Sequence, residues 1–138
     1  MRSSTPLYDR LAPTYEEHFE VVHRRAYDDL AWEICRAALP APPAHVVDVG
    51  CGVGRWAGRL LDEGYAVTGI EPAPAMAERA ARLLADRSPG PPARLVRSRV
   101  EDAELAAGSA DGVLAMGSLQ YTEDPAAEVA RLARWLGA

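Results

Sequence analysis

His45-Val-Val-Asp-Val-Gly-Cys-Gly-Val-Gly-Arg55 is the stretch from which the architecture of the chain is predicted. Its first half is a run of β-branched residues, which is typical of a buried strand in a parallel sheet. Its second half has glycine at positions 50, 52 and 54, so no Cβ atom keeps a ligand away from the backbone. Helical spacing resumes at Arg55, and the free N–H groups of a helix N-terminus favour an anionic group. The pattern predicts a strand, a ligand-binding turn and a helix.

A second acidic residue, Glu71, follows the next predicted strand, residues 66–70. In a doubly wound sheet this position lies beside the first glycine turn, where a carboxylate can accept both hydroxyls of a ribose. Such a site serves either a dinucleotide or S-adenosylmethionine, and residues 52–57 satisfy the dinucleotide pattern G-x-G-x-x-A weakly. Asp48 favours the second ligand, because an acid before the glycines would repel a pyrophosphate and suit the ammonium of a bound amino acid.

The order of these motifs resembles that of the class I S-adenosylmethionine-dependent methyltransferases of the small-molecule type. The first motif of that family is an acid followed by G-x-G-x-G, here Asp48-Val-Gly-Cys-Gly-Val-Gly54. Glu71-Pro-Ala-Pro-Ala-Met76 is similar to the second motif. Residues 97–105 look like the adenine-edge segment, and residues 110–121 look like the fourth strand. Residues 8–15, Tyr-Asp-Arg-Leu-Ala-Pro-Thr-Tyr, resemble the helical lid of small-molecule members.

The resemblance implies a fold, a cofactor and a set of contacts. The fold is a Rossmann-like three-layer α/β/α sandwich with a mainly parallel sheet, and S-adenosylmethionine is the cofactor, with S-adenosylhomocysteine as product. The methionine part is expected on Asp48 and the glycine turn, the ribose on Glu71, the adenine near Met76 and Val100, and the sulfonium near residues 116–118. The expected cofactor-binding residues are Tyr15, Asp48, Gly50, Cys51, Gly52, Gly54, Glu71, Pro72, Met76, Val100, Glu101, Met116, Gly117 and Ser118.

No catalytic residue is assigned, because methyl transfer from a sulfonium depends mostly on the alignment of donor and acceptor. Gln120-Tyr121 stands where many small-molecule members carry Glu-His, so a histidine base is absent from that position. The histidines and the cysteines, Cys35 and Cys51, show no metal-ligand spacing, and no metal is expected.

Length and composition limit the partners. The 138 residues fit one domain, with residues 1–44 as an N-terminal helical lid and residues 45–138 as the Rossmann-like core. All 15 basic residues are arginine, which excludes lysine-dependent chemistry. The net charge of −5 and the lack of a dense basic tract disfavour a nucleic-acid substrate and favour a small-molecule acceptor. No apolar leader or membrane-length run is present, so a cytoplasmic protein is expected.

Periodicity and turn residues predict the remaining elements. Helices are expected over residues 14–19, 23–39, 55–63, 74–86 and 125–136, and strands over residues 46–49, 66–70, 94–97 and 112–116. The helix over residues 23–39 has Tyr27, Leu30, Ile34 and Ala38 on one face. Gly64 is expected to end one helix and Asp124 to cap another.

Complete members of the family have seven strands, and this chain ends after the fourth strand and its helix. Val113–Met116 would then form an open apolar edge, which predicts a homodimer or a hetero-complex through that edge. Two other functions stay open at this point: a non-catalytic S-adenosylmethionine-binding or assembly subunit, and an NAD(P)-dependent oxidoreductase.

Overall fold

The computed structural model describes residues 5–19, 22–87 and 89–137, and it contains one sheet of four parallel strands. The strands are β1 (His45–Val49), β2 (Ala66–Ile70), β3 (Ala93–Val96) and β4 (Gly112–Leu114). Their order is β3-β2-β1-β4. β2 and β3 lie on one side of β1 and β4 lies on the other, so the order in which strands are added reverses at β1. The predicted parallel Rossmann-like sheet is confirmed. Such a reversal leaves a crevice at the carboxyl ends of the strands, and this is where ligands bind in open α/β sheets.

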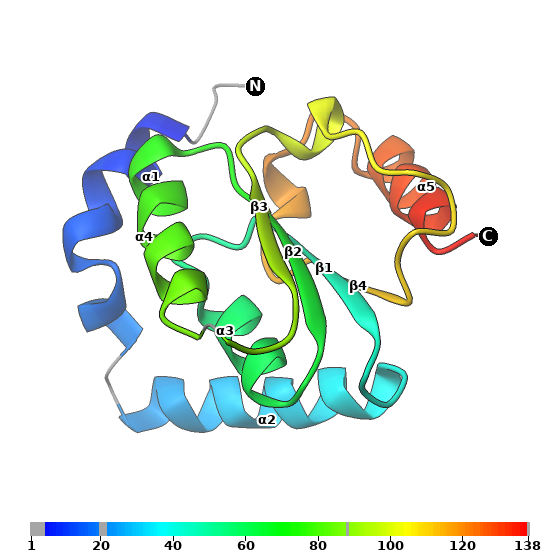
Figure 1. The fold of residues 1–138 in the computed structure, drawn as a ribbon. Helices are drawn as coiled ribbons and strands as arrows, with labels where there is room; N and C mark the ends of the chain where they lie inside the picture. Colours follow the sequence, from blue (N-terminus) through cyan, green and yellow to red (C-terminus); the bar gives the residue numbers. More distant parts are fainter. Residues whose placement is uncertain (1–4, 20–21, 88, 138) are drawn as a thin grey trace.

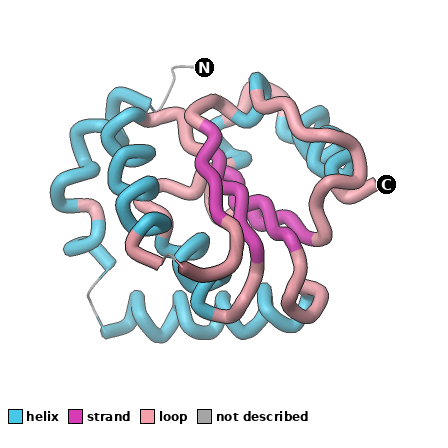
Figure 2. The backbone as a smooth tube through the Cα atoms, in the orientation of Figure 1, coloured by secondary structure: helices cyan, strands magenta, loops and turns pink. Residues whose placement is uncertain are grey.

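Helices cover both faces of this sheet (Figures 1 and 2). They are α1 (Thr5–Leu11), α2 (Val22–Ala38), α3 (Arg55–Asp62), α4 (Pro74–Ala85) and α5 (Pro125–Trp135), with short 3-10 turns η1 (Ala12–Thr14), η2 (Glu16–Phe19), η3 (Val100–Asp102) and η4 (Leu119–Tyr121). On one face Val46 and Val67 pack against side chains of α2, α3 and α4, and on the other Val47, Val49 and Ile70 pack against α5. The three-layer arrangement follows from the alternation of side chains along each strand.

Most element boundaries fall within two residues of the prediction. α3 begins at Arg55, and Gly64 follows it with a φ of 94°. Asp124 caps α5, since its Oδ1 accepts a hydrogen bond from the Ala127 N–H at 3.0 Å. The N-terminal segment differs: a helix was expected over residues 14–19, but α1 ends at Leu11 and two 3-10 turns follow. Pro13 explains the break, because proline cannot donate a helical backbone hydrogen bond.

The buried face of α2 is also different from the one that the apolar pattern suggests. Tyr27, Leu30 and Ile34 are 60%, 63% and 64% exposed. Asp28 and Trp32 are buried instead, at 3% and 6% exposure. The apolar stripe of this helix therefore points away from the sheet.

The contacts between α2 and α3 account for this orientation. The carboxylate of Asp28 forms an ion pair with Arg55, at the start of α3. Trp32 stacks on Trp56 with ring centroids 5.8 Å apart, and the Arg59 guanidinium lies over both rings. Burial of the Trp32 ring against the partly buried Trp56, together with a paired carboxylate, outweighs burial of the three exposed apolar side chains.

The edge strand β4 is shorter and better covered than expected. It ends at Leu114, which is buried, and Val113 and Ala115 pack against the cluster under α5. The apolar side chains of the expected open edge are therefore partly covered, with Leu114 buried and Val113, Ala115 and Met116 half-buried. The backbone edge itself is open, since β1 is the strand neighbour of β4 in the described part of the chain. Among the described residues, no helix has the length and apolar character to cross a bilayer.

The orientation of α2 leads to a stability prediction. Trp32→Ala should lower the free energy of unfolding by about 3–5 kcal/mol, because it removes a buried aromatic side chain. Leu30→Ala, on the exposed face of the same helix, should change it by no more than about 0.5 kcal/mol. Urea denaturation of both variants measures the difference. A larger loss in Leu30→Ala than in Trp32→Ala would show that the apolar stripe is the buried face.

Candidate functional site

A cavity opens at the carboxyl ends of the strands, between the glycine turn, the start of α4 and the 3-10 turns η3 and η4. Its lining residues are Thr5, Tyr8, Tyr15, Val49, Gly50, Gly52, Ile70, Glu71, Pro72, Met76, Arg99, Val100, Glu101, Met116, Gly117, Ser118, Tyr121, Thr122 and Glu123. These residues come from separate segments between residues 5 and 123, and the position of β1 between β2 and β4 brings them together.

Glu71 is fixed in the wall of this cavity by backbone donors. The Gly52 N–H donates to its Oε2 at 2.9 Å, and the Ala73 N–H donates to its Oε1 at 2.8 Å. A carboxylate has about four lone-pair sites, so both oxygens keep acceptor capacity for a ligand. Burial raises the pKa of Glu71, and the two N–H donors oppose that rise. The side chain is thus oriented before any ligand arrives.

Asp48 lies beneath the glycine turn, inside the sheet and not on the cavity wall. It is 1% exposed, and its Oδ2 has no hydrogen-bond partner among the residues that the structure describes. Burial and, to a smaller extent, the charge of Glu71 raise the pKa of this carboxyl, a hydrogen bond from the Ala57 backbone opposes the rise, and the resulting pKa is about 7. An unpartnered buried carboxylate is costly unless another group satisfies it.

The first glycine of the turn allows a close approach between two segments. Gly50 has a φ of +68°, and a Cβ at this position would lie 2.5 Å from the Cβ of Ser118. Any side chain here would be strained and would push the segment after β4 away from the turn. The Ser118 Oγ is itself buried without a partner. The glycine therefore keeps the first and fourth strands in contact at the cavity floor.

The structure brings most of the predicted site residues together on the cavity wall. Tyr15, Gly50, Gly52, Glu71, Pro72, Met76, Val100, Glu101, Met116, Gly117 and Ser118 line it. Three others do not. One is the buried Asp48. Cys51 packs its Sγ against Gly69 of β2, and Gly54, with a φ of +91°, faces Ala80 of α4. Gly54 has a structural role here, since it allows α3 and α4 to approach.

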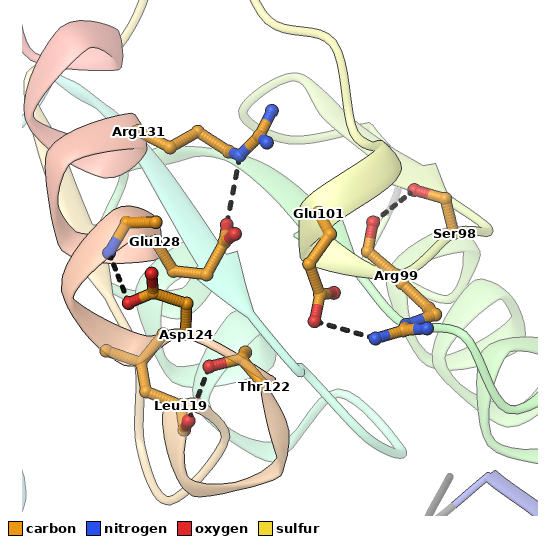
Figure 3. A network of polar contacts seen from close by, with 9 residues as sticks. Ser98, Arg99, Glu101, Leu119, Thr122, Asp124, Glu128 and Arg131 are labelled. Carbon is orange, nitrogen blue, oxygen red and sulfur yellow. Dashed lines mark hydrogen bonds and ion pairs between the residues drawn. The ribbon is translucent and has the colours of Figure 1, made fainter. Parts of the chain in front are cut away.

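Polar contacts stabilise the segments at η3 and η4, both of which contribute residues to the cavity wall (Figure 3). Arg99 donates to Glu101 Oε1 at 2.8 Å. Burial alone would raise the pKa of Glu101, but a backbone hydrogen bond and the Arg99 guanidinium hold it below its usual range. On the opposite side the Thr122 hydroxyl donates to the Leu119 carbonyl at 2.9 Å and stabilises η4. Glu101 therefore stays ionised beside the cavity.

Two lining tyrosines were not among the predicted site residues. The hydroxyls of Tyr8 and Tyr121 are 2.7 Å apart, and the Tyr8 ring meets those of Tyr15 and Tyr121 edge to face. Burial and the bond to Tyr121 raise the pKa of Tyr8, and burial raises the pKa of Tyr15. Tyr8 and Tyr15 therefore stay protonated near neutral pH, and neither of these two serves as a base there. The lid resemblance of residues 8–15 and the replacement of histidine by Tyr121 were the available sequence signals.

Comparison with known proteins finds relatives of this chain in sequence and in fold. The chain is 33% identical over 93 residues to the uncharacterized methyltransferase YrrT of Bacillus subtilis strain 168, which covers 63% of this chain and 42% of that protein. It is 32% identical over 139 residues to the biotin biosynthesis bifunctional protein BioCD of Bordetella avium strain 197N, which covers 98% of this chain and 28% of that protein. The chain thus spans less than half the length of these two curated relatives.

Among solved structures, the crystal structure of the [4+2]-cyclase SpnF has a similar fold. The TM-score is 0.83 at 19% identity, over 96% of this chain and 54% of that one. A likeness at this identity concerns the fold alone. The family is decided by sequence, since residues 46–137 match the family described as "Methyltransferase domain". This chain therefore belongs to the methyltransferase domain family, and the predicted relation to the class I S-adenosylmethionine-dependent methyltransferases is confirmed.

Proposed function

We propose that the cavity binds S-adenosylmethionine and that the chain acts in methyl transfer to a small molecule. The observation that carries the proposal is the hydrogen bond between the Gly52 N–H and Glu71. It joins the glycine turn to Glu71, which follows the next strand and, when ionised, only accepts hydrogen bonds. A ligand that carries a ribose beside an amino-acid tail requires this combination of a backbone turn and an acceptor.

The unsatisfied atoms of the site fit this ligand. Asp48 Oδ2 is buried beneath the turn with no hydrogen-bond partner among the described residues, and the positive charge of a ligand ammonium held at the turn would favour the ionised form of this carboxyl. The Ser118 Oγ is the second unpartnered atom, and Ser118 lies on the cavity wall. A pyrophosphate would instead bring negative charge toward both Asp48 and Glu71, which disfavours the dinucleotide alternative.

We assign the residues of the chain to binding and orientation. Bound S-adenosylmethionine supplies a methyl group activated by a positively charged sulfur. Glu71 would orient the ribose, Met76 and Val100 would border the adenine, and Met116 and Ser118 would border the sulfonium. Because Tyr8 and Tyr15 stay protonated, the chain contributes alignment and exclusion of water, and no base is assigned.

Charge and cysteine state support a small acceptor and a cytoplasmic setting. The net charge is −5, and the sequence has no dense basic tract that could follow a phosphate backbone. Cys35 and Cys51 are both free thiols, which suits a reducing compartment. In the same proposal, residues 1–44 form the lid of a single domain and residues 45–138 its core.

The ligand assignment predicts that the chain binds S-adenosylmethionine and S-adenosylhomocysteine and does not bind NAD or NADP. Isothermal titration calorimetry with the four ligands measures this. Glu71→Ala should weaken binding of the adenosyl ligands by about 1.5–3 kcal/mol, because charge-assisted hydroxyl contacts are lost.

Glu78→Ala is the matched control for that titration, since it removes an exposed glutamate of α4 that does not line the cavity. Its affinity should equal that of the parent. Saturable dinucleotide binding without adenosyl-ligand heat would overturn the cofactor assignment, and parental affinity in folded Glu71→Ala would overturn the ribose role.

Binding should also depend on pH through Asp48, whose pKa is raised to about 7. A ligand ammonium favours the ionised carboxylate, so affinity should increase as the pH rises toward 7 and level off above it. Below that value it should fall by up to about tenfold per pH unit, because binding must then remove a proton. Calorimetry with S-adenosylhomocysteine over this range tests the slope, and Asp48→Asn should flatten it. An equally steep profile in Asp48→Asn would assign the proton to another group.

We further propose that the open backbone edge of β4 pairs with a strand from a second copy or from a partner chain. Unpaired N–H and C=O groups on an edge strand are a template for such pairing. Light scattering over a dilution series should therefore give a mass above that of the monomer. A monomer at every concentration would contradict the pairing of two copies.

A further inference from the structure

The N-terminal segment, α1 with η1 and η2, is attached to the rest of the protein along α4. Asp9 Oδ1 accepts a hydrogen bond from the Ala75 N–H at 2.8 Å. Arg79 donates to the Pro13 carbonyl at 3.3 Å and forms an ion pair with Glu16. Ala12 is buried in a cluster with residues of the glycine turn and α4. In Figure 1 this segment, in blue, lies against α4.

On the other side of the cavity the same segment meets η4 through Tyr8. Its hydroxyl lies 2.7 Å from that of Tyr121, and the two rings are edge to face at 5.7 Å. The two residues are 113 positions apart, and both line the cavity. This bond is exposed, and so are the two contacts of Arg79, but the α4 side also has the part-buried Asp9–Ala75 hydrogen bond and the buried Ala12. The N-terminal segment thus has one firm attachment and one weak one, with the cavity between them.

We propose that the Tyr8–Tyr121 hydroxyl pair is a latch that holds the N-terminal segment over the cavity and must open before an adenosyl ligand enters or leaves. The inference rests on the proposed function of this cavity. Tyr8 and Tyr121 act as positioning residues, because each acts by holding the other in place through the hydroxyl bond. Opening breaks the exposed hydroxyl bond, and the segment stays attached along α4.

The latch has a kinetic signature that distinguishes it from a ligand contact. The bond joins two parts of the protein, so its strength contributes equally to the ligand-bound and the ligand-free protein. Loss of the bond should raise the rate constants for association and dissociation together and leave Kd unchanged. Loss of a direct contact would raise the dissociation rate and Kd in the same proportion.

The test is stopped-flow tryptophan fluorescence of the full chain with S-adenosylhomocysteine. Tyr8→Phe and Tyr121→Phe keep the ring packing and remove one hydroxyl each. Each should speed both association and dissociation by about three- to tenfold, the effect of one exposed hydrogen bond. The double variant should match the single variants, because the two hydroxyls share one interaction.

Tyr65→Phe is the matched control. It also removes a phenol hydroxyl with a protein partner, since Tyr65 donates to the Pro40 carbonyl at 2.9 Å, but it lies before β2 and not on the cavity wall. Its rate constants should equal those of the parent even if its stability falls. The latch is disproved if both single variants keep parental rates, or if Kd rises in step with the dissociation rate. A parent chain that binds no adenosyl ligand would overturn the proposed function as well.

Discussion

The hydrogen bond from the Gly52 N–H to the Glu71 carboxylate is the interaction on which the site depends. It joins the turn after β1 to the end of β2, and the Gly50 and Cys51 N–H groups reinforce this junction by donating to the Ile70 carbonyl at 2.8 and 3.0 Å. Because backbone donors hold the turn and the acid together, the polar groups of the site are oriented by the sheet itself. Such preorganisation reduces the entropy that a ligand must lose on binding.

A steric constraint sets the other wall of the cavity. The chain can bring Ser118 against the glycine turn only because Gly50 lacks a Cβ, and this contact positions the segment that carries Tyr121. The buried atoms left without partners, on Asp48 and Ser118, lie beside this junction. Unsatisfied buried polar groups are rare in folded proteins, so their presence near the carboxyl ends of the strands supports the proposed ligand site.

Family membership and fold do not by themselves define the reaction. The similar fold of a [4+2]-cyclase shows that the same architecture carries other chemistry, and function must be argued from the site. Here the site combines acceptors that can orient a ligand with two tyrosines, Tyr8 and Tyr15, whose pKa values are raised by burial, and the proposed methyl transfer requires no base. That combination suits a reaction whose electrophile is already activated, and it assigns the tyrosines to closure of the cavity.

The strand, the glycine turn and the position of Glu71 at the end of the next strand were predicted from sequence, because a run of β-branched residues, glycine geometry and the order of strand and acid are local properties. The orientation of α2 was not: its apolar stripe is exposed, and the ion pair of Asp28 with Arg55 and the stacking of Trp32 on Trp56 decide which face is buried. The pairing of Tyr8 with Tyr121 likewise exists only in the folded chain. Local patterns specify where the backbone turns, whereas contacts between residues far apart in sequence depend on how helices pack, and packing is a property of the whole tertiary structure.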